Sequence, residues 1–114
     1  MSFEHLNKAQ IDELALMLGQ EFPEFINTFI VSSEGLINSL KQQLKGGDCA
    51  GFVISIHSLK GSCRNIGAER LSNYCLIVET SAKEDSISVI NPDLPEICQE
   101  FEILRASLEQ LARN

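Results

Sequence analysis

His57 is the residue of this chain whose neighbours best suit chemistry. With about 100° per residue along a helix, His57 lies away from the apolar stripe that includes Phe52. The same side carries two cations and a glycine, namely Lys60, Arg64 and Gly61. A neutral imidazole beside cations, on an open surface, suits attack on an anionic phosphoryl group. The pattern therefore indicates phosphoryl chemistry at His57.

Two further residues support this interpretation. Gly61 costs about 0.8–1 kcal/mol relative to alanine in a helix interior, which indicates that something must approach the backbone beside His57. Glu79 lies on the following helix, near where an antiparallel neighbour that starts at Ala68 returns level with His57. Its carboxylate is thus a candidate to hold the second ring nitrogen of the histidine.

The charge balance argues against nucleic acid and anionic membranes as partners. Sixteen acidic and nine basic residues give a net charge of −7, the wrong sign for binding phosphate backbones. Apolar runs such as Phe52–Ile54 are far shorter than the roughly 20 residues that span a bilayer. The first residues lack the pattern of a secretory signal, so we expect a cytoplasmic protein.

Apolar residues recur at helical spacing along most of the sequence. They predict a short helix at Asn7–Leu18 and four longer helices at about 22–45, 49–66, 68–83 and 93–112. The polar run from Lys83 to Ser88, together with Asn91 and Pro92, predicts the last connection. We therefore expect one all-α domain over residues 1–114, an antiparallel up-down four-helix bundle with an additional short N-terminal helix.

The remaining chemistry-bearing residues predict no metal or nucleotide site. The four cysteines form no C-x-x-C pair and are interpreted as small buried apolar residues: Cys49, Cys63, Cys75 and Cys98. Neither histidine follows a glutamate at the spacing of a di-metal bundle, and there is no phosphate-binding glycine loop. His5, close to the terminus, is assigned no role.

The segment from His57 to Gly67 reads H-S-L-K-G-S-C-R-N-I-G. It resembles the H-x-L-K-G-x-x-x-x-x-G signature of histidine phosphotransfer (HPt) domains. That family folds as a four-helix bundle, often with an extra N-terminal helix, so the resemblance extends over essentially the whole chain. It implies a carrier that moves a phosphoryl group between the aspartates of receiver domains in a two-component phosphorelay.

The resemblance implies a role for each matching residue. His57 would be the phosphoacceptor, Lys60 would stabilise the phosphoryl oxygens, and Gly61 would give the receiver clearance. Glu79 matches a position that fixes the second ring nitrogen, and Lys83 matches one that is basic in some members. Arg64 is assigned to binding from helical geometry alone.

The expected partners are response-regulator receiver domains and a hybrid sensor kinase. Magnesium belongs to the receiver, so we expect no intrinsic cofactor and no autonomous kinase or phosphatase activity. The net charge favours a monomer. For docking around His57, the candidate apolar contacts are Val53 and Ile54, with Leu16 and Met17 of the first helix.

One alternative keeps the same fold. A non-catalytic helical interaction module that binds and inhibits receiver domains would need the bundle and the docking surface but not His57 and Lys60. The presence of both residues favours transfer, and labelling of His57 would distinguish the two functions.

Overall fold

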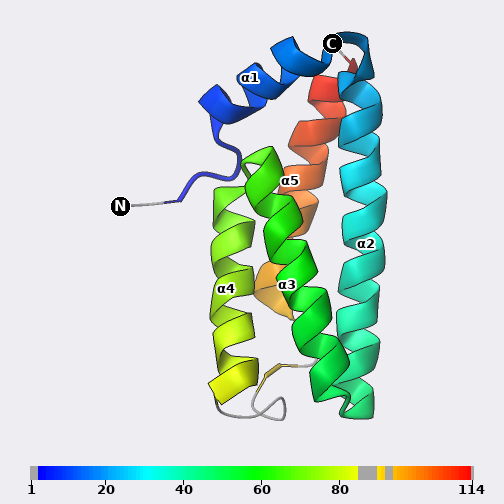
Figure 1. Ribbon diagram of the computed structural model, residues 1–114, viewed down its shortest axis with the longest axis vertical. Helices are drawn as coiled ribbons and strands as arrows, with labels where there is room; N and C mark the ends of the chain where they lie inside the picture. Colours follow the sequence, from blue (N-terminus) through cyan, green and yellow to red (C-terminus); the bar gives the residue numbers. More distant parts are fainter. Residues whose placement is uncertain (1–2, 85–89, 92–93, 114) are drawn as a thin grey trace.

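A computed structural model describes residues 3–84, 90–91 and 94–113. Its elements are α1 (Lys8–Leu18), a short 3-10 helix (Gly19–Glu21), α2 (Phe22–Gly46), α3 (Cys49–Ile66), α4 (Glu69–Glu84) and α5 (Pro95–Arg113). Neighbouring helices from α2 to α5 run in opposite directions, and α1 lies across one end (Figure 1). This arrangement confirms the predicted four-helix bundle with an additional N-terminal helix. Most of the predicted connection before α5, residues 85–89 and 92–93, lies outside the described residues.

Local sequence signals set the helix ends that frame α3. Asp48 caps the start of α3, where its side chain accepts a hydrogen bond from the amide of Gly51. Gly67 ends α3 with a left-handed φ of 86°. Because α4 begins two residues later, α3 and α4 form an antiparallel pair joined by a very short turn. This pair carries His57 and Glu79.

The core lies along the inner faces of α2 to α5. Its most completely buried side chains include Phe52 and Leu59 of α3, Leu71 of α4 and Leu104 of α5. Burying a side chain of this size contributes about 1.5–3 kcal/mol relative to leaving it in water. The same packing fixes the rotation of α3, so the opposite side of that helix faces solvent.

The cysteines only partly match the prediction. Cys63 and Cys75 are buried and Cys98 is half-buried, but Cys49 is exposed, and all four are free thiols. The prediction is wrong at Cys49. This residue is the first of α3, and the core along this helix begins only at Phe52.

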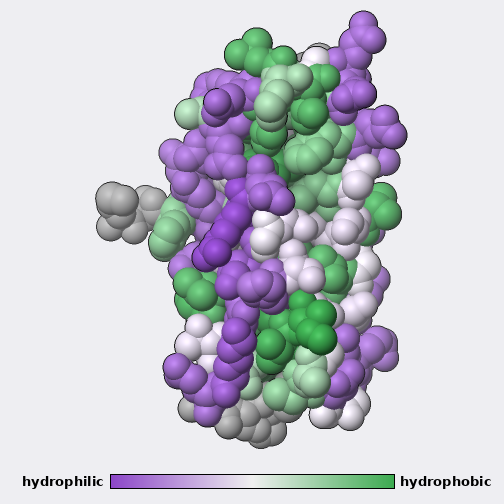
Figure 2. Space-filling view, viewed as in Figure 1, coloured by the Kyte–Doolittle hydropathy of each residue, from purple (hydrophilic) through white to green (hydrophobic). Residues whose placement is uncertain are grey.

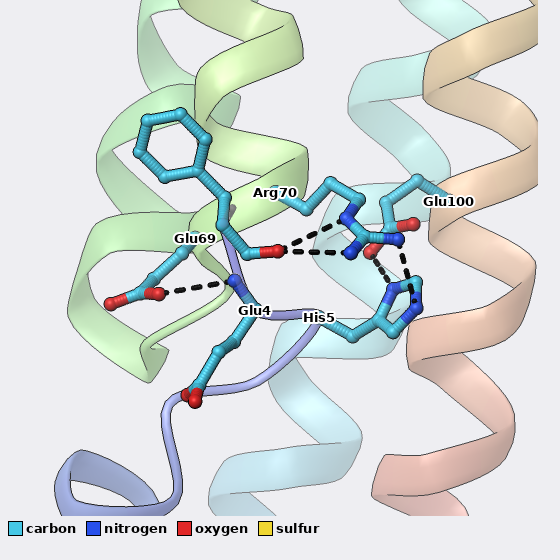
Figure 3. Close-up of polar contacts among 6 residues, drawn as sticks. Glu4, His5, Glu69, Arg70 and Glu100 are labelled. Atoms are coloured by element: carbon cyan, nitrogen blue, oxygen red, sulfur yellow. Dashed lines mark hydrogen bonds and ion pairs between the residues drawn. The ribbon is translucent and has the colours of Figure 1, made fainter. Parts of the chain in front are cut away.

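Residues Phe3–Asn7, which we call the N-terminal strap, are bound to the end of the bundle. The amide of Arg70 donates to the carbonyl of Glu4 over 2.9 Å, and the amide of Asn7 donates to the carbonyl of Gly67 over 2.8 Å. The guanidinium of Arg70 also donates to the carbonyl of Phe3, at 3.2 Å from Nε and 3.0 Å from Nη2. The strap thus follows the start of α4 (Figure 3).

His5 is the centre of a polar cluster in this strap, although its place near the terminus predicted no role for it. Its Nδ1 lies 2.5 Å from Oε2 of Glu100, and its Nε2 lies 3.1 Å from Nη1 of Arg70 (Figure 3). Arginine only donates, so Nε2 accepts and Nδ1 carries the proton that Glu100 accepts. These two contacts select one neutral tautomer of His5.

Candidate functional site

His57 lies on the solvent side of α3, as its helical position predicts. Its side chain is 68% exposed, and its Nδ1 is 3.0 Å from Oε2 of Glu79. Because the carboxylate accepts, the proton of the neutral ring is on Nδ1. The lone pair is then on Nε2, where it is available for nucleophilic attack. The predicted contact between Glu79 and the histidine is therefore present.

Glu79 is the buried centre of the site. Its side chain is only 3% exposed, yet it contacts two ammonium groups besides the imidazole. Nζ of Lys60 lies 2.6 Å from Oε1, and Nζ of Lys83 lies 3.1 Å from Oε2. Burial alone would raise the pKa of Glu79, but the hydrogen bonds from Lys60, Lys83 and His57 together outweigh it and hold the pKa at about 2. The carboxylate is therefore charged at physiological pH.

The two lysines occupy different environments. Lys60 is buried with its ammonium on Glu79, whereas the side chain of Lys83 is 56% exposed. The helical wheel places Lys60 among the outward residues of α3. Within that group, however, Lys60 lies at the edge that adjoins α4. Its long side chain follows the interface between the two helices to the carboxylate. Lys83 is the more accessible of these two cations.

Gly61 and Arg64 lie on the exposed side of α3, as predicted. A Cβ atom added to Gly61 would meet no other atom within 4 Å. The packing of the bundle therefore does not require a glycine there. This open space agrees with the expectation that a partner approaches the backbone beside His57.

The docking prediction needs one correction. Val53 is half-buried and packs against the core, so it is less available to a partner than predicted. Ile54 is 68% exposed, and Leu16 and Met17 are exposed on α1. On the face that α3 and α4 present, a hydrophilic strip runs between apolar patches (Figure 2). Apolar residues thus flank the polar site.

Metal-ligand clusters and membrane-spanning helices are both absent from the described residues. No group of three or more His, Cys, Asp or Glu side chains within the described ranges is arranged to hold a metal ion. None of the helices there is long and apolar enough to cross a membrane. The described site presents an oriented, exposed imidazole beside ammonium groups.

Comparison with known proteins gives consistent matches. The model of the Hpt domain family matches residues 24–114. The crystal structure of histidine-containing phosphotransfer protein B from Pseudomonas aeruginosa PAO1 superposes with a TM-score of 0.91 at 29% identity, over 98% of this chain and 97% of the other. Histidine-containing phosphotransfer protein 1 of Arabidopsis thaliana is 26% identical over 95% of this chain and 74% of its own length. The phosphorelay protein LuxU of Vibrio harveyi is 27% identical over 76% of this chain and 77% of its own length.

Proposed function

Because the chain belongs to the Hpt domain family and serves histidine phosphotransfer in a phosphorelay, we propose that His57 is the residue that carries the phosphoryl group. The observation that carries this proposal is the contact between Nδ1 of the exposed His57 and the buried Glu79. It fixes the ring and its tautomer, so that Nε2 is the nucleophile. The partners are response regulators and kinases, and we propose that their receiver domains meet this side of α3.

The proposed transfer step forms one bond to phosphorus and breaks another. The lone pair on Nε2 attacks the phosphorus of an aspartyl phosphate, and the bond from phosphorus to the aspartate oxygen breaks. The aspartate leaves as a carboxylate with that electron pair. The imidazole keeps its proton on Nδ1 and gains positive charge, which the Glu79 carboxylate at 3.0 Å offsets. The reverse step passes the phosphoryl group to the next receiver.

Positive charge beside the ring supports phosphoryl transfer at His57. Lys60 and Lys83 both contact the carboxylate that holds His57, and we assign them to stabilisation of the phosphoryl oxygens. Lys83 is the more exposed of the two. Gly61 and Arg64, on the outer side of α3, are assigned to contact with the receiver.

The remaining parts of the proposal concern the setting of the reaction. Magnesium is assigned to the receiver domain, where it would neutralise the charge of the aspartyl phosphate. The chain itself is assigned no kinase or phosphatase activity. We assign it to the cytoplasm as a monomer, and gel filtration at micromolar concentration tests the oligomeric state.

Transfer from a phosphorylated receiver domain with Mg²⁺ tests the function. The wild-type chain is expected to gain a label that is lost in acid and kept in alkali, and His57→Gln is expected to gain none. Binding of receivers without any label on the wild-type chain would instead support the module that captures and inhibits receivers.

A further inference from the structure

We propose that the N-terminal strap forms one wall of the surface that docks a receiver domain, by completing a groove that lies beside the His57 site. This inference rests on the proposed function. Four parts of the chain line the groove, which includes Phe3 of the strap, Gln10 of α1, Arg64 of α3, and Asn73 and Leu76 of α4. The strap thus contributes to a surface whose other walls are α1 and the two helices of the phosphotransfer site.

The groove lies next to the site along α3 and α4. Arg64 lies seven residues after His57, so the two side chains point in directions about 20° apart and lie roughly 10 Å apart along the helix axis. Leu76 lies three residues before Glu79, less than one turn away on α4. The groove therefore opens on the same side of the bundle as the imidazole.

A receiver that reaches His57 also covers the end of this groove that is nearest the site. Even a weak, transient protein interface buries on the order of 500 Å² on each partner, which corresponds to a patch with a radius of about 13 Å. Arg64 falls within that radius of His57 along α3. The occupant that these observations favour is therefore the receiver domain itself, because the transfer reaction requires it to sit here.

The groove has the composition of a protein interface. Phe3 is 49% exposed and Leu76 is 41% exposed. Arg64 lies in the same groove and is exposed. Aromatic residues and arginine are enriched at the centres of protein interfaces, which fits Phe3 and Arg64. Arg64 also complements the acidic pocket of a receiver, although the chain as a whole is acidic.

The strap is held well enough to act as a wall. Its carbonyl at Phe3 accepts two hydrogen bonds from Arg70, and Arg70 in turn contacts His5. His5 is anchored on Glu100, whose side chain is 4% exposed. On the outer side, Glu69 accepts hydrogen bonds from the Glu4 amide and the Asn7 side chain. The position of Phe3 is thus fixed before any partner binds.

Two neighbouring residues of α4 offer a matched test. Leu76 lines the groove, whereas Ile77 is 55% exposed and lines a separate hollow with Leu94 and Pro95. A panel of receiver domains is first screened for the one that binds the wild-type chain most tightly. Calorimetry then measures the Kd of that receiver for Phe3→Ala, Leu76→Ala and Ile77→Ala. We expect the first two substitutions to raise Kd at least fivefold and the third to change it less than twofold. Equal effects at Leu76 and Ile77, or no effect at Phe3, would overturn the inference.

A partner-free measurement separates this inference from the proposed function. Phosphoramidate, a small phosphoryl donor, is used to label the chain with no receiver present. Phe3→Ala and Leu76→Ala are expected to label at the wild-type rate, because neither residue belongs to the His57 contacts. Failure of the wild-type chain to label would count against His57 as acceptor, while the Kd values would still decide the role of the groove.

Discussion

The ammonium of Lys60 lies 2.6 Å from Oε1 of Glu79, and both side chains are buried between α3 and α4. This ion pair joins the two helices at the carboxylate that orients His57. A buried charge without its partner is strongly unfavourable. The stability of the bundle and the orientation of the histidine therefore depend on the same pair.

Glu79→Gln is expected to destabilise the fold, because it leaves the buried ammonium of Lys60 without an anion. We expect the free energy of unfolding in urea to fall by about 3 kcal/mol. Lys60→Met in the same background should recover part of that loss. A double-mutant cycle that shows no coupling between residues 60 and 79 would contradict this prediction.

Acid should weaken the wild-type protein more than Glu79→Gln. The pKa of Glu79 is held at about 2 in the folded chain, against an ordinary value of 4.5. A lowered folded pKa gives stability that is present above pH 4.5 and is lost as the pH falls toward 2. The loss attributable to Glu79 is expected to be of the order of 3 kcal/mol, checked by urea unfolding at several pH values. If the free energy of unfolding changed with pH in the same way for the two proteins, folding would not lower the pKa of Glu79.

Gly61→Ala and Gly67→Ala are expected to have opposite effects on stability. Gly61→Ala adds a methyl group in open space and should stabilise α3 by up to about 1 kcal/mol. Gly67→Ala should destabilise the fold, because φ is +86° and the new Cβ would lie 3.2 Å from the Gln10 side chain. Thermal unfolding compares the two.

Gly61→Ala should also slow transfer from a receiver, since the added methyl group lies where the partner approaches. Wild-type transfer rates in this variant, with the expected gain in stability, would show that Gly61 provides no clearance.

His57→Gln should leave the fold intact, because the side chain is 68% exposed and lies outside the core. We expect the circular dichroism spectrum to be unchanged and Tm to move by no more than a few degrees. A loss of helicity would contradict the orientation of His57 toward solvent.

His5→Ala should loosen the strap, because Glu100 loses the partner that it has in the wild-type chain. The Arg70 amide reports this directly. It lies in the first turn of α4, where amides have no partner within the helix, and it donates to the carbonyl of Glu4. Its hydrogen exchange should become at least tenfold faster. The Gly51 amide, which Asp48 caps at the start of α3, is the control that should not change.

Much of the fold followed from the sequence because each helix has a regular apolar stripe and recognisable ends. The site was less completely predictable. The position of Glu79 beside His57 follows from helix lengths, but its burial with two lysines depends on how α3 and α4 rotate against each other. A wheel drawn for one helix contains no information on its neighbour, which is why the inward direction of Lys60 was missed.

The strap could not be predicted from local pattern. Phe3, Glu4 and His5 have no periodicity, and their partners are 65 to 95 residues away in the sequence. The only signal in the sequence was the presence of His5, and its proximity to the terminus argued against a role for this residue. Contacts of this kind appear only when the bundle has brought α4 and α5 together.

The exposure of His57 has a consequence for signalling. In the proposed function, a phosphoryl group on this ring is open to water and to every receiver that docks, so its lifetime depends on hydrolysis and on the concentration of acceptors. When transfer is faster than hydrolysis, the phosphorylated fraction at steady state follows the ratio of phosphorylated donors to free acceptors. A carrier with this geometry reports that ratio, and not the absolute amount of either protein.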